Sequence, residues 1–461
     1  MLSRRALVSR RAMLTGVAGA AGAGLAAASL SATAAAAAPI GVTAAKDDAT
    51  TLGGATLAAT GEVPRQPVTT GLEALAADGW AALAGQKVGV ISNPTGVTGD
   101  YVHGVDLMHA DDRVDIVAVF GPEHGFRGSA QAGGSEGTGI DERTGLTVYD
   151  AYGANATKFA TLFGKAGVET VVFDIQDVGA RFYTYIWTMY QAMVAAAGAG
   201  LRFVVLDRPN PIGGEAYGPM MTSAYTSGVG LREIVQQHGM SVGELARFFN
   251  GEFLAHEAGA AELDVVWCRG WRRDVRYGDL DLPWVLPSPN MPTPDTALVY
   301  PGTCLFEGVG NISEGRGTTR PFELIGAPFL DHHWGDALNG YELPGVRFRE
   351  AYFSPTFSKH TGVVCNGVEV KVTDRYAYQP IRTAVAMLVE AHKYPDFAWR
   401  YDSYDPVRPY WVDKLTGSTR LHTMIDSGAT ADEVVAEWSD ELADFRARRA
   451  QYLHYMGPST G

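Results

Sequence analysis

The chain has 461 residues, of which 46% are hydrophobic, and its formal net charge at pH 7 is −14. This length is sufficient for two domains with separate hydrophobic cores. A strongly acidic chain is repelled by phosphate backbones, so we expect no nucleic acid among its partners.

The first 38 residues have the pattern of an export signal. Four arginines between positions 4 and 11 precede a weakly apolar run rich in alanine and glycine, and Ala32-Thr33-Ala34 is a small-residue cleavage site. The pair Arg10-Arg11 is typical of the twin-arginine route, which carries folded proteins. The alternative is a basic membrane anchor, which the weak apolarity of the run disfavours. We therefore expect an exported protein, extracellular or associated with the cell wall, with no stable membrane span after signal cleavage.

Residues 39–66 have no apolar periodicity and are predicted to form a flexible leader, so the fold begins near Val68. Short, continuously apolar segments then alternate with helical patterns. Strands are predicted at 87–93, 114–120, 170–173, 201–206 and 263–267, and helices at 72–83, 183–197 and 241–254. Ser241 and Glu244 form a capping-box pattern at the start of the last of these helices. This alternation predicts an α/β domain over 67–296, with a doubly wound, mostly parallel sheet.

The residue composition and the hydrophobic pattern of the sequence change after residue 296. Glycine-rich turns at 308–317 are followed by aromatic segments and a polar helical pattern at 431–452. Residues 297–461 are therefore predicted to form a smaller α+β domain.

Polar residues follow the apolar part of four predicted strands. They are Asn93 after the first, Glu123 and His124 after the second, Asp174, Gln176 and Asp177 after the third, and Asp207, Arg208 and Asn210 after the fourth. In an open parallel sheet the carboxyl ends of the strands share one edge, where ligand crevices form. A role as a helix cap or turn former explains a polar residue after one strand. It does not readily explain polar residues at the same point after four strands, so we predict a single site at this edge.

Glu123 lies in the segment Gly121-Pro122-Glu123-His124-Gly125-Phe126-Arg127-Gly128. Cleavage of a glycosidic bond requires a carboxylic acid that protonates the leaving oxygen, often with a second carboxylate nearby. Glu123 follows an apolar strand, where partial burial favours the neutral form of a carboxyl group. We expect Glu123 to be this acid; the alternative is a surface ion pair between Glu123 and Arg127.

The segment 174–185 gathers two carboxylates, an arginine and two tyrosines at a strand-to-helix turn. Asp174 or Asp177 is the candidate for the second carboxylate, and Arg181 can hold an acidic substituent by a bidentate pair. Tyr183 and Tyr185 are candidate substrate contacts. The alternative role of Asp177 is to cap the following helix.

A further candidate loop runs from Asn311 to Thr319, where Glu314 and Arg316 are either substrate contacts or an ion pair that closes the turn.

Gly133-Gly134-Ser135-Glu136-Gly137 matches the nucleophile elbow of serine hydrolases, but an elbow requires a preceding apolar strand and none precedes this segment. The three cysteines are far apart and the histidines show no compact ligand spacing, so we expect no metal and no cofactor, and at most one disulfide.

With these residues in view, the sequence resembles the family of exo-acting β-N-acetylmuramidases, formerly a family of unknown function. The resemblance rests on the segments 91–97, 120–128, 172–185, 206–214, 238–246 and 286–319. It implies a Rossmann-like first domain, a smaller second domain that closes an active-site cleft, and hydrolytic release of terminal N-acetylmuramic acid (MurNAc) from MurNAc-GlcNAc ends without a cofactor. It also implies that Glu123 is the catalytic acid, and its matched segments add His238 and Asn290 to the candidate binding residues.

The implied partners are peptidoglycan-derived muropeptides and other MurNAc-containing saccharides. Muramic acid carries a lactyl carboxylate that glucosamine lacks, and Arg127, Arg181 and Arg316 are the candidate cations for it. Two other functions stay open: a non-catalytic peptidoglycan-binding protein that uses the same cleft, and, less favoured, a serine hydrolase acting on wall peptides or esters.

Overall fold

The computed structural model describes residues 65–131, 133–257 and 259–455 of the chain. The predicted signal peptide at 1–38 and all but the end of the predicted leader lie outside these residues. The described residues belong to one compact unit, which begins at Val63.

The central feature is a sheet of seven strands in the order β3-β4-β2-β1-β5-β6-β9. Its strands are β1 (Lys87–Ser92), β2 (Asp115–Gly121), β3 (Gly139–Ile140), β4 (Thr147–Asp150), β5 (Thr170–Asp174), β6 (Arg202–Leu206) and β9 (Glu262–Val266). All neighbours pair in parallel except the short edge strand β3. Taken in chain order, the six parallel strands have the order 3-2-1-4-5-6 of the Rossmann fold, which confirms the predicted fold class.

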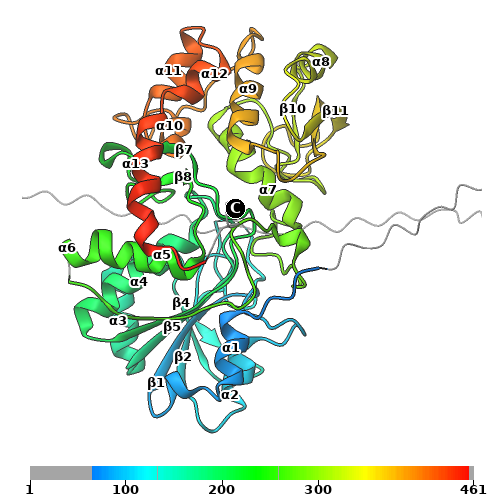
Figure 1. Cartoon of the computed structure of the whole chain (residues 1–461). Helices are drawn as coiled ribbons and strands as arrows, with labels where there is room; N and C mark the ends of the chain where they lie inside the picture. Colours follow the sequence, from blue (N-terminus) through cyan, green and yellow to red (C-terminus); the bar gives the residue numbers. More distant parts are fainter. Residues whose placement is uncertain (1–64, 132, 258, 456–461) are drawn as a thin grey trace, which may run out of the picture. The chain divides into compact units, whose positions relative to one another are not determined.

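Helices cover both faces of this sheet (Figure 1). One face packs against α1 (Gly71–Ala77) and α2 (Gly104–His109), and the other against α3 (Ala156–Ala166), α4 (Tyr185–Ala199) and α5 (Val242–Phe249). Because side chains alternate along a strand, Val172 of β5 faces the first layer while Val171 and Phe173 face the second. The central strands are therefore buried on both sides, which is why they are almost continuously apolar in the sequence.

The predicted capping box begins α5. The Ser241 hydroxyl accepts a hydrogen bond from the Glu244 amide at 3.2 Å, and the Glu244 carboxylate accepts one from the Ser241 amide at 3.0 Å. The helix then passes into a π-helical turn (Asn250–Leu254) and α6 (Ala255–Glu257).

A two-stranded antiparallel hairpin, β7 (Tyr217–Met220) with β8 (Val235–Gln237), extends from the end of β6 toward the second half of the chain. The second half has an antiparallel sheet in the order β10-β12-β11, in which β11 (Val346–Phe353) pairs along its full length with β12 (Cys365–Val372) beside β10 (Leu324–Ala327). Its helices are α7 (Pro294–Thr303), α8 (His332–Gly340), α9 (Pro380–His392), α10 (Trp411–Thr416), α11 (Arg420–Asp426) and α12 (Ala431–Ala436). This is the predicted smaller α+β architecture.

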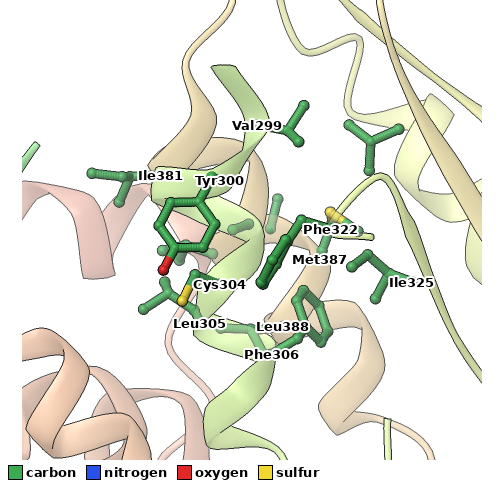
Figure 2. Close-up of a cluster of buried hydrophobic side chains, with 14 of the residues drawn as sticks. Val299, Tyr300, Cys304, Leu305, Phe306, Phe322, Ile325, Ile381, Met387 and Leu388 are labelled. Carbon is green, nitrogen blue, oxygen red and sulfur yellow. The ribbon is translucent and has the colours of Figure 1, made fainter. Parts of the chain in front are cut away.

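The core of the second half lies between α7, α9 and the small sheet (Figure 2). Tyr300 and Phe306, from α7 and the 3₁₀ turn after it, meet Phe322 and the α9 residues Ile381 and Met387. Fully burying each such side chain contributes about 1.5–3 kcal/mol. The same cluster includes Val178 and Phe182 of the loop before α4, so the core is continuous with the edge of the large sheet.

The last helix, α13 (Ser439–Arg449), returns to the first half of the chain. Phe445 packs against Phe248 of α5 at a ring-centroid distance of 5.6 Å, and Arg449 donates to the carbonyl oxygens of His238, Gly239 and Gly214. The single helix predicted at 431–452 is wrong, because it is broken at Trp438, which is buried in the second core.

No helix in the described ranges is long and apolar enough to span a membrane. Cys268, Cys304 and Cys365 are all buried free thiols. Within the part of the chain that the structure covers, no cluster of three or more histidine, cysteine, aspartate or glutamate side chains is arranged to hold a metal ion.

Candidate active site

The site lies at the carboxyl ends of β1 and β5, where the strand order of the sheet reverses. The loops that leave the two strands are tied together: the Ser92 hydroxyl donates to the Asp174 carbonyl oxygen at 2.9 Å, and the Gln176 amide donates to the Thr95 hydroxyl at 2.9 Å. Thr95 in turn donates to the side chain of Asn93 at 2.6 Å. The predicted residues of these two loops are therefore brought together.

Glu123 lies on the loop after β2 and lines a hollow of about 440 Å³. One carboxylate oxygen accepts a hydrogen bond from the Thr184 hydroxyl at 3.0 Å, and the other accepts from the Gly133 amide at 2.9 Å. The loop turns sharply through His124 and Gly125, whose φ angles are +71° and +87°. Glu123 is thus held in one orientation, half-buried, with its carboxyl group at the edge of a sugar-sized space.

The alternative role for Glu123, an ion pair with Arg127, is excluded by the structure. Arg127 forms a bidentate pair with Asp141, at 2.9 and 2.8 Å, and also contacts Asp106 at 2.9 Å. These contacts fix the loop after Glu123 but occupy the guanidinium, so Arg127 is not a free cation for a substrate carboxylate.

Tyr183 and Tyr185 lie between Glu123 and Asp177. The Tyr185 hydroxyl donates to the Pro287 carbonyl oxygen at 2.5 Å and lies 3.4 Å from the Glu123 carbonyl oxygen. The two tyrosine rings meet edge to face at 5.3 Å. Burial raises the pKa of both phenols, and the nearby charges of Asp177 and Glu123 add to the effect. Both tyrosines therefore stay neutral hydrogen-bonding groups.

Asp177 is oriented by His238. The Nδ1 atom of His238 accepts from the Met240 amide at 3.2 Å, so its Nε2 atom carries the proton and donates to Asp177 Oδ2 at 3.3 Å. The same oxygen accepts from the Gly179 amide at 2.7 Å. Asp177 does not cap α4, which begins eight residues later at Tyr185. Because both ring nitrogens of His238 are occupied, it positions Asp177 rather than contacting a substrate.

Several buried polar atoms at this site have no hydrogen-bonding partner among the described residues. They are Asn93 Nδ2, Gln176 Oε1, Asp177 Oδ1, the Tyr183 hydroxyl and Asn290 Nδ2. Leaving such an atom unsatisfied costs about 1–3 kcal/mol. Such donors and acceptors suit the hydroxyl and amide groups of a sugar, but the residues that carry them do not line the hollow beside Glu123.

Asp174 and Arg208 are not available for catalysis or binding. Arg208 Nε lies 2.6 Å from Asp174 Oδ1, and its Nη2 lies 3.1 Å from Oδ2. Both side chains are nearly fully buried, and Arg208 also donates to the Val97 carbonyl oxygen. The pair joins the ends of β5 and β6, so the prediction of Asp174 as a catalytic group and of Arg208 as a substrate contact is corrected to a structural ion pair.

Asp207 and Asn210 also have structural roles. Asp207 accepts hydrogen bonds from the Gly243 amide, the Ser241 hydroxyl and the Tyr455 hydroxyl at the start of α5. Burial raises the pKa of Asp207 to about 7, against the effect of these donors. Asn210 donates to the Met240 carbonyl oxygen and accepts from the Ile212 amide, which occupies both ends of its amide. Neither side chain contacts the hollow beside Glu123.

The prediction that Arg181 holds a substrate carboxylate is wrong. Its side chain is fully buried, and its guanidinium donates to the carbonyl oxygens of Pro219, Ile234 and Leu415. Burial lowers the pKa of Arg181 to about 9. Arg181 therefore fastens the loop before α4 to the β7–β8 hairpin and α10.

The loop that carries Glu314 and Arg316 is closed by its own ion pairs. Arg316 pairs with Glu307 at 2.6 Å and with Glu314 at 3.4 Å, and Glu314 also meets Lys359 at 2.9 Å. This is the alternative that the sequence left open, and a contact of either residue with substrate stays a prediction. His124 stays in the site region, with Nδ1 donating to the Ala130 carbonyl oxygen at 3.0 Å, which leaves Nε2 as an acceptor.

The structure adds residues that the sequence analysis missed. Thr184 and the Gly133 amide hold the Glu123 carboxylate, and Thr95 links the loops after β1 and β5. Trp187 and Gln191, one and two turns along α4 from Thr184, line the hollow. The helical spacing 184, 187, 188 and 191 was a signal for this lining, because these positions lie on one face of a helix.

The fold is a Rossmann-like α/β fold, and the site presents the carboxyl group of Glu123 at a sugar-sized hollow, an arrangement that suits a glycosidase. Two family models match the chain, exo-β-N-acetylmuramidase NamZ, N-terminal, over residues 88–295, and exo-β-N-acetylmuramidase NamZ, C-terminal, over residues 298–455. The chain belongs to the NamZ family of exo-β-N-acetylmuramidases.

Individual relatives agree with this assignment. The peptidoglycan β-N-acetylmuramidase NamZ of Bacillus subtilis is 45% identical over 391 residues, which cover 84% of this chain and 91% of that protein. Crystal structures of two DUF1343 family proteins from Bacteroides fragilis are similar to this chain. One has 32% identity and a TM-score of 0.75, covering 85% of this chain and 100% of its own. The other has 29% identity and a TM-score of 0.68, covering 85% and 99%.

Proposed function

We propose that this chain is an exo-acting glycosidase that releases N-acetylmuramic acid from the non-reducing end of peptidoglycan fragments. The observation that carries the proposal is the oriented carboxyl group of Glu123 at the 440 Å³ hollow, in a chain that belongs to this enzyme family. The B. subtilis relative is named as a peptidoglycan β-N-acetylmuramidase, which supports the same substrate class here.

Glu123 is the general acid in this mechanism. Protonation of the glycosidic oxygen requires that Glu123 carry a proton before the reaction and lose it during bond cleavage. The Thr184 hydroxyl supports both states, because a hydroxyl can accept a hydrogen bond from the acid and donate one to the carboxylate. The Gly133 amide holds the other oxygen throughout.

Asp177 is the second carboxylate. Its Oδ2 atom is held by His238 and Gly179, while its Oδ1 atom is buried without a partner among the described residues. A fixed negative charge here stabilises the positive charge that develops on the sugar ring as the bond breaks. The free amide groups of Asn93 and Asn290 are donors for the acetamido and lactyl oxygens of the sugar.

A non-catalytic peptidoglycan-binding protein is the weaker alternative. Binding alone does not require a carboxyl group fixed by two donors at the edge of the hollow, and the family to which the chain belongs consists of glycosidases.

The substrate assignment is tested with two chromogenic glycosides that differ only in the lactyl group, one of N-acetylmuramic acid and one of N-acetylglucosamine. We expect kcat/KM to be about 100-fold or more higher for the muramoyl compound, because amide donors that pair with the lactyl oxygens stay unpaired when the analogue lacks that group. Equal rates for the two compounds would contradict the assignment, and the absence of hydrolysis of either would favour the binding protein.

The proposal includes export. The arginine pair Arg10-Arg11 before an apolar segment supports the twin-arginine route. Replacing both arginines by lysine in the full-length chain is expected to retain the protein inside the cell, as measured by immunoblotting of cell and medium fractions. Export of the Lys-Lys variant at the normal level would contradict this route.

A further inference from the structure

A second and larger cavity, of about 590 Å³, lies where the first and second halves of the chain meet. Residues 212–217 and 273–276 line it from the first half, and residues 375–380, just before and at the start of α9, line it from the second. It shares no lining residue with the hollow beside Glu123. The proposed function makes no use of this cavity.

The cavity is strongly cationic. Five arginines line it, against two acidic residues; the arginines are Arg273, Arg276, Arg375, Arg446 and Arg449, and the acids are Glu215 and Asp274. The whole chain is acidic, so this concentration of positive charge runs against the overall composition. Such a concave cluster attracts anions.

Some of these arginines are committed to the fold. Arg273 pairs with Glu244, Arg375 lies 3.2 Å from Asp279, and Arg446 donates to the Ala216 carbonyl oxygen. These three side chains contribute positive potential, but their strongest contacts are already made.

Arg276 is different. Its guanidinium makes no hydrogen bond or ion pair with the residues described, and its Nε atom is buried without a partner. The group lies over the ring of Tyr376 at 5.5 Å, which holds it in place. Burial lowers the pKa of Arg276, against the opposing effect of the nearby charges of Glu215, Asp274 and Asp279.

Arg449 also lines the cavity. Its side chain is only 7% exposed, and both terminal nitrogens are fixed by backbone carbonyl oxygens. The remaining donor, Nε, is buried and has no partner in the described part of the chain. The cavity is thus lined by the guanidinium of Arg276, which has no partner among the described residues, and by that of Arg449, which backbone carbonyl oxygens hold in place.

We propose that this cavity binds a small organic anion that carries a carboxylate or phosphate group, which is held by the guanidinium of Arg276 in the positive potential of Arg449. Guanidinium groups bind both kinds of oxyanion with charge-assisted hydrogen bonds, and the cavity has the volume of a small-ligand site. Because both halves of the chain line the cavity, the bound anion also connects them. This site is separate from the one that holds the sugar at Glu123.

Isothermal titration calorimetry of the purified protein at constant ionic strength tests the proposal. The probes are citrate, a tricarboxylate, and glucose 6-phosphate, with glucose as the uncharged control. We expect at least one anion to bind and glucose not to bind; the tighter probe distinguishes a carboxylate ligand from a phosphate ligand. Failure of both anions to bind at millimolar concentration would overturn the proposal.

Two variants locate the binding. Arg276→Gln is expected to weaken the anion about tenfold, the effect of losing one charge-assisted contact. The matched control is Arg143→Gln, an exposed arginine that pairs with Asp106 away from the cavity, and it should leave the affinity unchanged. If Arg276→Gln does not fold, Arg375→Gln at the rim replaces it, with a smaller expected loss. Equal weakening by the cavity variant and the control would contradict the site.

Hydrolysis of the muramoyl glycoside by Arg276→Gln is expected to proceed at the normal rate without added anion, because Arg276 does not line the hollow beside Glu123. The proposal of the anion site and the proposal of glycosidase activity can therefore be contradicted independently of each other.

Discussion

Glu123→Gln is expected to lower kcat for the muramoyl glycoside by about 1,000-fold or more, with little change in the affinity for the sugar. Glutamine keeps the shape of the side chain and can still accept a hydrogen bond from Thr184, but it cannot deliver a proton to the leaving oxygen. General acid catalysis contributes about 10²–10⁴-fold in comparable enzymes. Initial rates and calorimetric binding of N-acetylmuramic acid measure the two effects separately.

The matched control for this variant is Glu142→Gln, which removes the same charge from an exposed position in the first half of the chain. It should leave kcat unchanged. A residual rate in Glu123→Gln within a factor of ten of the normal enzyme would show that another group is the acid, and Asp177 would then be the next residue to replace.

Arg208→Met is expected to reduce the free energy of unfolding by about 3–5 kcal/mol, because it leaves the carboxylate of Asp174 buried without its partner. The two side chains are 5% and 2% exposed, so water cannot replace the lost contacts. Urea unfolding followed by circular dichroism measures the change. In contrast, Arg113→Met breaks the exposed pair with Asp111 and should leave the unfolding midpoint nearly unchanged.

The double variant Asp174→Leu with Arg208→Met distinguishes a lost ion pair from a lost packing contact. Removing both charges takes away the unpaired buried carboxylate, so the double variant should be more stable than Arg208→Met alone. If the double variant is instead less stable by the sum of the two single effects, the two residues act independently and the structural assignment of this pair is wrong.

Much of the fold could be predicted from local patterns. The strands β1, β2, β5 and β6 are largely buried on both faces and are therefore almost continuously apolar in the sequence, and α5 begins at a capping box that two residues define. The strands that were missed in the first half of the chain are short. The four-residue strand β4 and the hairpin β7–β8 give too few positions for a period to emerge, and they are stabilised by contacts with distant segments.

The break in the predicted helix at 431–452 has the same origin. Its polar pattern is continuous, but Trp438 is drawn into the core of the second half while Leu442 and Phe445 pack against α4 and α5 in the first. One straight helix cannot reach both cores. The helix propensities of these residues do not indicate which core each side chain packs into.

The sequence by itself determined that polar residues gather at the carboxyl ends of parallel strands, and that Glu123 is the carboxyl group to test. This was possible because a short, continuously apolar segment indicates a buried strand, and the polar residues that follow it mark the carboxyl end of that strand. Only the tertiary structure decided which of those polar residues face a ligand. Arg181 reaches Leu415, and Asp207 reaches Tyr455, across more than 200 residues of chain. A charged side chain that finds such a buried partner loses its freedom to bind substrate, and the identity of that partner depends on how the chain folds back on itself.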